Sequence, residues 1–334
     1  MEERNIAVNV LDRIVCIRLD VNIWSGQKKL TAQDLGLTPD QIPPEELAAL
    51  GRKRICDPQA LAVFRKLKER GERLLRANGV RFLDGYAVPA NSMARINEQL
   101  DDLGREFKEA RTEFVADYDN AVESWIARHP DWTEQLRRAI EPVERVAGSL
   151  NWRRHCFQVV HPGAGTDPGL AEEVGGLGGQ LLREVAQEAK ETFEDSYQDK
   201  EEVTRRALRP LHRMYQKMLS LNFLEPKVRP FLDLMIGVIK AADGQPGRIA
   251  GQELRELQSL LLLLMEPGKI MAGEFPVFRV HDARPAKAKA VKPQLLPLES
   301  PEVPDVPDEA DGAEEAPVPA AEPLAGLAAP PVWF

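Results

Sequence analysis

The sequence predicts a mainly α-helical chain with a long antiparallel helical hairpin or coiled-coil arm, a small N-terminal α/β element and a disordered C-terminal tail. Two long segments carry apolar residues at helical spacing, and a short N-terminal run alternates apolar and polar residues. The end of the chain is rich in Pro, Ala and acidic residues. We therefore divide the chain into an N-terminal element (1–57), a helical body (58–282) and a disordered tail (283–334).

The N-terminal element is predicted to contain a strand. Apolar side chains between residues 13 and 24 alternate with polar ones, which is typical of a half-buried strand. Thr31 and Asp34 have the spacing of a capping box, so a short helical turn is expected there. Asp57-Pro58 then starts a helix that Asn78-Gly79 ends.

The predicted arm consists of helices at about 91–128 and 180–222. The first stripe repeats every three and four residues, as in coiled-coil heptads, and its helix would be about 57 Å long. Pro210 is expected to kink the second helix. Because both stripes need cover, we expect them to pair, either within one chain or in a homo-oligomer. The first stripe contains Met93, Ile96, Leu100, Leu103, Phe107, Ala110 and Phe114.

The remaining elements are expected to be shorter. Residues 226–242 and a segment ending near Met265 have helical signals, and 79–89 reads as an extended or hairpin-like connector. Residues 156–160 and 275–281 are candidate strands. The glycine-rich segment 162–179 is interpreted as a flexible linker. A dinucleotide-binding loop there would need its third glycine where Pro168 stands.

Residues 20–31 raise the question of a phosphate-binding loop. When Gly26 is aligned with the second glycine of that motif, Val21, Gln27 and Lys28 occupy defining positions with the wrong residues. A strand end, a turn and a helix cap account for the segment instead. Trp24 beside two lysines is a candidate contact surface.

No motif for catalysis or metal binding is found. His155, Cys156 and His161 are close in sequence, but the paired spacing of a zinc site is missing, and a core cysteine flanked by surface histidines is the simpler interpretation. There is no G-x-S-x-G nucleophile motif. We therefore predict a protein that is not an enzyme and has no cofactor.

Composition predicts a cytoplasmic protein without a membrane span. Three widely spaced cysteines suit a reducing compartment, and no signal peptide is visible. The most apolar run, 260–265, is far shorter than the roughly 18 residues that a span needs. Nine of the 53 acidic residues lie beyond residue 298, where Lys and Arg are absent, so the rest of the chain is electrically balanced.

Two segments are candidate binding sites. Residues 52–81 contain ten basic and three acidic residues, and this basic surface could be a solvated face or could bind nucleic acid, an acidic partner or the chain's own tail. The apolar tip of the tail is either a partner-binding anchor or a free end. The candidate residues are Arg52, Lys53, Arg54, Arg65, Lys66, Arg73 and Arg76 in the basic surface, and Val332, Trp333 and Phe334 in the tip.

Four stretches, 19–36, 50–58, 79–89 and 125–132, resemble the bacterial family called domain of unknown function 3150. The resemblance covers about residues 10–280 and carries over no catalytic residue. It implies a protein encoded in mobile elements, plasmids or phages near a MoxR-like AAA+ ATPase and a protein with a von Willebrand A-type domain. The expected function is therefore a scaffold or adaptor in such a system, and the alternative is a DNA-binding accessory factor.

Overall fold

The computed structural model describes residues 10–38, 41–44, 46–160, 168–244 and 247–275. Residues 1–281 form one unit and 282–334 another, and all described residues belong to the first. This unit is mainly helical with a small sheet, which confirms the predicted fold class at that level. The predicted disordered tail, 283–334, and its tip lie outside the described residues.

A four-stranded antiparallel sheet contains the predicted N-terminal strand, β1 (Ile14–Asn22). The hairpin of β4 (Val80–Phe82) and β5 (Gly85–Pro89) flanks β1 on one side, and β6 (Asn151–Phe157) flanks it on the other. The predicted strand at 156–160 therefore starts earlier, because β6 pairs with β1 from Asn151 onward.

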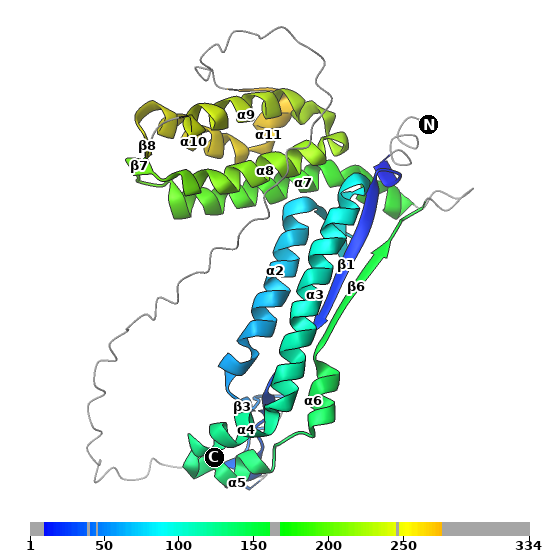
Figure 1. Cartoon of the computed structure of the whole chain (residues 1–334), viewed down its shortest axis with the longest axis vertical. Helices are drawn as coiled ribbons and strands as arrows, with labels where there is room; N and C mark the ends of the chain where they lie inside the picture. The colour runs from blue at the N-terminus through cyan, green and yellow to red at the C-terminus, as the bar shows by residue number, and fades with distance from the viewer. Residues whose placement is uncertain (1–9, 39–40, 45, 161–167, 245–246, 276–334) are drawn as a thin grey trace, which may run out of the picture. The chain divides into compact units, whose positions relative to one another are not determined.

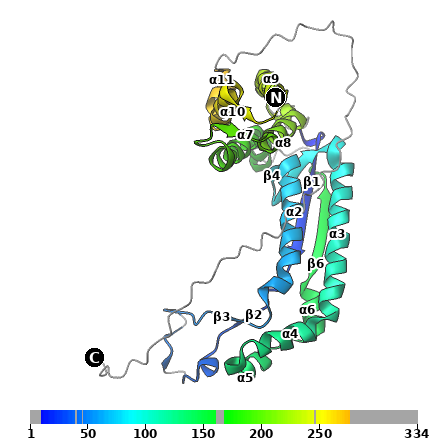
Figure 2. The same ribbon diagram turned by 60° about the vertical axis from the view of Figure 1, so that its left-hand side comes forward.

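Two helices cover one face of this sheet, as Figures 1 and 2 show: α2 (Ala62–Asn78) and α3 (Met93–Ala116). Asp57 accepts a hydrogen bond from the Gln59 amide, and Pro58 opens a 3-10 turn that continues into α2, so the predicted helix start is confirmed. Apolar side chains from both helices and from β1 form one hydrophobic cluster. It includes Ile17, Phe64, Leu67, Leu75, Ile96, Leu100 and Phe107.

The first long predicted helix is divided into α3 and α4 (Tyr118–Ala127) at Asp117. Its apolar stripe is buried, but its cover comes from α2, β6 and α6 (Val143–Ser149). The short helix α5 (Thr133–Arg137) packs on α4. Neighbouring parts of the chain thus supply the cover that the coiled-coil prediction assigned to a second long helix.

The second long predicted helix is broken. It corresponds to α7 (Pro168–Ser196) and α8 (Leu208–Ser220), which are separated by β7 (Glu202–Val203). The kink expected at Pro210 does not arise, because Pro210 lies in the first turn of α8. Backbone N–H groups in the first turn have no acceptor within the helix, so the N–H that proline lacks costs no intrahelical hydrogen bond.

The stripes of α7 and α8 are buried in a second hydrophobic cluster, together with α9 (Arg229–Asp243), α10 (Gly251–Leu264) and α11 (Pro267–Ala272). The two predicted stripes therefore belong to different clusters, and the structure does not show a coiled-coil arm. Strand β8 (Ile249–Ala250) pairs with β7. The predicted helix ends near Ala242 and Met265 agree with α9 and α10.

The glycine-rich segment is not a linker from residue 168 onward, because α7 begins at Pro168. Gly178 has a packing role in this helix: a Cβ atom there would lie 2.7 Å from the carbonyl oxygen of Leu224. Residues 161–167 lie outside the described chain, as does the predicted strand beyond Phe275.

Candidate interaction surface

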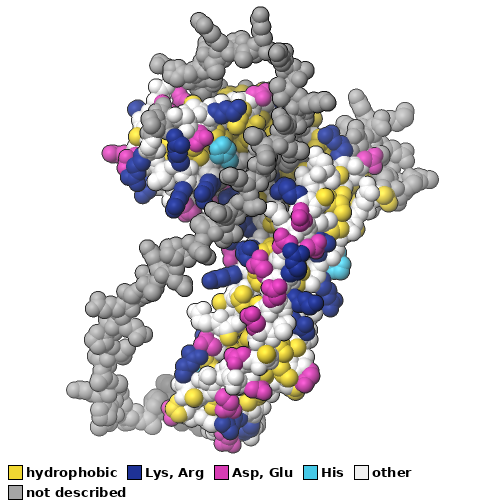
Figure 3. Space-filling model, viewed as in Figure 1, with side chains coloured by type: hydrophobic (Ala, Val, Ile, Leu, Met, Phe, Trp, Pro, Cys, Tyr) yellow, Lys and Arg dark blue, Asp and Glu magenta, His cyan; other side chains and the backbone are white. Residues whose placement is uncertain are grey.

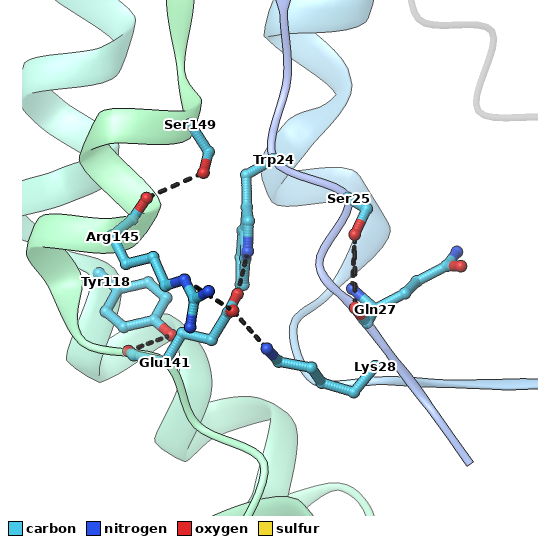
Figure 4. A network of polar contacts seen from close by, with 8 residues as sticks. All are labelled: Trp24, Ser25, Gln27, Lys28, Tyr118, Glu141, Arg145 and Ser149. Atoms are coloured by element: carbon cyan, nitrogen blue, oxygen red, sulfur yellow. Dashed lines mark hydrogen bonds and ion pairs between the residues drawn. The ribbon is translucent and has the colours of Figure 1, made fainter.

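Glu141 is the centre of a polar network that answers the question raised by residues 20–31 (Figure 4). Its carboxylate accepts a hydrogen bond from Trp24 Nε1 at 2.6 Å and another from Lys28 Nζ, and Arg145 Nε lies 3.8 Å away. The backbone oxygen of Glu141 accepts a hydrogen bond from the Tyr118 hydroxyl at 3.0 Å. The candidate contact residues Trp24 and Lys28 therefore hold the segment before α6 against the end of β1.

The network lowers the pKa of Glu141. Burial alone would raise it, but hydrogen bonds from Lys28 and Trp24 favour the carboxylate and lower the pKa below its ordinary value. Gly26 makes the turn between these two donors possible, because its φ of 63° is unfavourable for other residues. The segment is thus a structural clamp, with no geometry of a phosphate loop.

A second clamp joins the strands β2 (Gln27–Lys29) and β3 (Arg52–Arg54) to their surroundings. Lys53 Nζ donates to the Asp34 carboxylate and to the Gln135 backbone oxygen at 3.2 Å. Asp34 also caps its own turn by accepting from the amide and hydroxyl of Thr31, both at 2.8 Å, which confirms the predicted capping box. Burial opposes the charge of Asp34, yet the bonds from Lys53 and Thr31 lower the pKa of this carboxyl.

These two clamps explain how two lysines can face each other. Lys28 and Lys53 are directly opposite in the β2–β3 register, an arrangement that like charges disfavour. Glu141 and Asp34 each neutralise one of them. Both lysines therefore serve to hold the ribbon in place.

The seven predicted basic residues are distributed over β3 and α2. Lys53 is partly buried and structural, whereas Arg52, Arg54, Arg65, Lys66, Arg73 and Arg76 are exposed. On α2, Arg73 pairs with Glu69 at 3.1 Å, and Arg65 donates to the Pro58 oxygen at 2.6 Å.

Other cations of α2 are also paired, since Arg70 forms two hydrogen bonds with Glu106 on α3. Figure 3 shows acidic and basic side chains interspersed over α2 and α3. The helix therefore offers a weaker positive field than its composition predicts.

Two of the three residues weighed as metal ligands, His155 and Cys156, lie on β6. Across the described ranges, no group of three or more His, Cys, Asp or Glu residues could hold a metal ion, and His161 is not described. Cys156 is exposed, so the expected core cysteine is wrong at this position. Its Sγ instead lies 3.3 Å from Asn97 Oδ1 at the sheet edge. Cys16 and Cys56 are the buried thiols, and burial raises the pKa of Cys16 to about 11.

A further site, which the sequence did not single out, is the edge strand β6. Trp152 points toward the helices, where Gly71 of α2 and Gly104 of α3 leave room for its indole. A Cβ at Gly71 would lie 2.8 Å from the indole, and one at Gly104 would lie 3.0 Å from it. Arg154 donates to the Asn97 oxygen at 2.8 Å and pairs with Asp101 at 3.1 Å. These contacts fix β6 on α3.

Between α3 and β6 lies an open hollow of about 400 Å³. It is lined by Asp101, Gly104, Arg105, Lys108, Trp152 and Arg154. On the opposite side of the strand, Arg153, His155 and Phe157 are exposed. The alternation of residues 152–157 between two sides could have been recognised from the sequence, had the strand been predicted to start before Cys156.

A buried lysine lies where α2, α7 and α8 meet. The side chain of Lys217 is only 2% exposed. Its Nζ donates to the Glu184 carboxylate and to the Arg76 backbone oxygen, both at 2.8 Å. Glu184 also accepts from the Arg81 amide at 3.0 Å. Lys217 thus joins α8 to α7 and to the C-terminal end of α2, which is a structural role.

The fold defines the class of this chain, which is a mainly helical protein with a small antiparallel sheet. The family "Protein of unknown function (DUF3150)" matches residues 11–266, and the chain belongs to that family. No curated protein and no solved structure matches the chain. Within the described part of the chain, no helix has both the length and the apolar content of a membrane span.

Proposed function

We propose that this protein is a non-enzymatic scaffold or adaptor of a mobile element or phage system that contains a MoxR-like AAA+ ATPase and a von Willebrand A-type protein. The observation that carries the proposal is the edge strand β6, which Arg154 fastens to α3 while Arg153 is exposed and the outer strand edge has no partner in the described ranges. A fixed strand edge is a common site for binding an extended segment of another protein.

The use of buried charges supports a scaffold. Lys53, Glu141 and Lys217 each connect segments that are distant in sequence, and their hydrogen bonds are made to structural partners. Catalytic groups, in contrast, usually face a cleft and combine perturbed pKa values with access to substrate. The family resemblance supplies the two partner classes, and the exposed strand edge supplies a surface for one of them.

Recovery of the complex tests this proposal. The tagged chain is isolated from its native host, with and without ATP, and co-purified proteins are identified by mass spectrometry. We expect both an AAA+ ATPase and a von Willebrand A-type protein in at least one nucleotide state. Recovery of neither in either state would refute the adaptor function.

The alternative function, binding of DNA, is favoured by one specific observation. Among the described residues, Arg52, Arg54, Lys66 and Arg76 have exposed side chains that form no ion pair. Such cations can contact phosphates, and this binding weakens steeply as salt concentration rises. Neutralising Arg65, Lys66, Arg73 and Arg76 should then weaken DNA binding and flatten its salt dependence. Affinity that does not depend on salt would exclude this alternative.

A further inference from the structure

The outer edge of β6 has unused backbone hydrogen-bonding groups. In the described ranges, β1 is the only strand that pairs with β6, and no other backbone hydrogen bond involves residues 151–157. Alternate N–H and C=O groups of an antiparallel edge strand point away from its partner. These groups can therefore pair with one additional strand.

An added strand would place alternate side chains over the hollow beside α3. Lys108 is exposed there and forms no ion pair with any described residue. Trp152 lines the same hollow, and no described acceptor takes a hydrogen bond from its indole N–H. A carboxylate could accept from this N–H and pair with Lys108, so an acidic side chain fits this side.

The other side of β6 is also positive. Arg153 is exposed, and although Asp20 lies opposite it in the strand register, the two form no ion pair. On the same side of the sheet, the next cross-strand pair is Arg18 and His155. Arg18 is exposed as well, so two arginines and one aspartate lie on this side of the two strands. Charge complementarity therefore favours an acidic segment on both sides.

A second copy of β6 is a poor occupant. Antiparallel pairing of two copies centred on Arg153 would place Arg153 opposite Arg153, and pairing centred on Arg154 would place Arg154 opposite Arg154. Like charges directly opposite each other destabilise a strand pair. The same basic residues that attract an acidic strand thus discourage self-association.

We propose that β6 binds an extended acidic segment of a partner protein by strand addition, with an acidic side chain in the hollow between Lys108 and Trp152. The segment adds a fifth strand next to β6 and lies beside Arg153 on the open face. This inference rests on the proposed function for the source of the segment, but the site itself can be tested with the purified chain alone.

The test uses the full chain and a fluorescein-labelled peptide, Glu-Val-Glu-Val-Glu-Val-Glu-Val, in a fluorescence anisotropy titration. A matched peptide, Glu-Glu-Pro-Pro-Glu-Glu-Pro-Pro, keeps the charge but lacks N–H groups on both sides of the strand. We expect this proline peptide to bind at least about tenfold more weakly, because prolines interrupt the strand ladder in either register. Hydrogen–deuterium exchange should show slower exchange at residues 151–157 only with the valine peptide.

Two double variants localise the site. K108E/R153E should weaken peptide binding about tenfold, because the glutamates lie on one side of the added strand and, whichever side they take, an attractive charge pair becomes repulsive. K66E/R76E makes the same change in net charge on α2 and should alter the affinity less than about twofold. All four side chains are exposed and form no ion pair with the described residues, so both variants are expected to fold.

Three results would overturn the proposal. They are equal binding of the two peptides, equal losses in the two double variants, and tighter binding of a short thymidine oligonucleotide that K108E/R153E abolishes. The last result would identify a nucleic-acid surface. A peptide that binds as expected, together with failure to recover the ATPase assembly, would keep this site and reject the proposed function.

Discussion

Strands β3 and β6 each carry consecutive basic residues, yet their charges have different roles. In β3, the Lys53 side chain is 13% exposed and pairs with Asp34, which is 7% exposed. In β6, Arg153 is exposed and unpaired among the described residues. The environment of each cation, more than the number of cations, therefore determines whether it stabilises the fold or is available to a partner.

Charge reversal at Lys53 and at Arg153 tests this comparison, and K53E is expected to have the largest effect on stability of all the variants. K53E should reduce the free energy of unfolding by about 3–5 kcal/mol, because it places a second carboxylate beside buried Asp34. R153E should change it by at most about 1 kcal/mol, because Arg153 is exposed and the new carboxylate lies opposite only the partly exposed Asp20. Urea unfolding followed by circular dichroism measures both. Similar losses in the two variants would contradict the distinction between β3 and β6.

Removal of the Glu141 carboxylate should have the next largest effect. E141A leaves Trp24 Nε1 and Lys28 without their acceptor, so we expect a loss of about 2–3 kcal/mol. The control is E123A, which removes an exposed ion pair with Arg137 and should cost at most about 0.5 kcal/mol. Equal unfolding midpoints for the two variants would show that the clamp contributes little.

A methyl group added at Gly71 should weaken the packing of β6 against α2. G71A should cost about 1–2 kcal/mol, because the new Cβ would clash with Trp152 and Leu19, and this outweighs the gain in helix propensity. In G175A the new Cβ meets no atom within 4 Å, so the same change in α7 should stabilise the protein by about 0.5–1 kcal/mol. Thermal unfolding of both variants checks the opposite signs. A stabilising G71A would contradict the tight fit of Trp152.

The smallest expected effect is a dependence of stability on pH. The folded-state pKa values of Asp34, Asp57 and Glu141 are lowered, so the unfolded chain binds more protons near their ordinary pKa values. The stability that these carboxylates contribute is complete above the unfolded pKa of about 4 and is lost as pH falls through the lower folded values. Urea midpoints between pH 6 and 3 should fall less steeply for D34N/E141Q than for the original chain. Identical slopes would exclude this contribution.

Local signals predicted much of the fold. The alternation around Ile17, the Asp57-Pro58 helix start and the capping box at Thr31 depend on neighbouring residues, and the structure contains all three. The partners of the long helices were not predictable in this way. An apolar stripe shows that a helix face needs cover, but it does not identify the element that supplies the cover.

In the candidate sites, too, contacts between distant segments could not be predicted from the sequence. Lys28 and Lys53 were recognised as part of basic stretches, but Glu141 and Asp34, which neutralise them, are brought close only by the fold. Trp152 and Arg153 were missed because the strand was predicted to begin at Cys156. Spacing within one segment could not show that Lys108 of α3 lies beside the same hollow.

Hydrogen–deuterium exchange on the assembly recovered from the native host tests the central claim most directly. If the protein is an adaptor that binds its partner through β6, exchange at residues 151–157 should slow in the assembly compared with the free chain. The clamped strands at 27–29 and 52–54 should exchange at the same rate in both. Unchanged exchange in β6, or slowing confined to β2 and β3, would contradict the account.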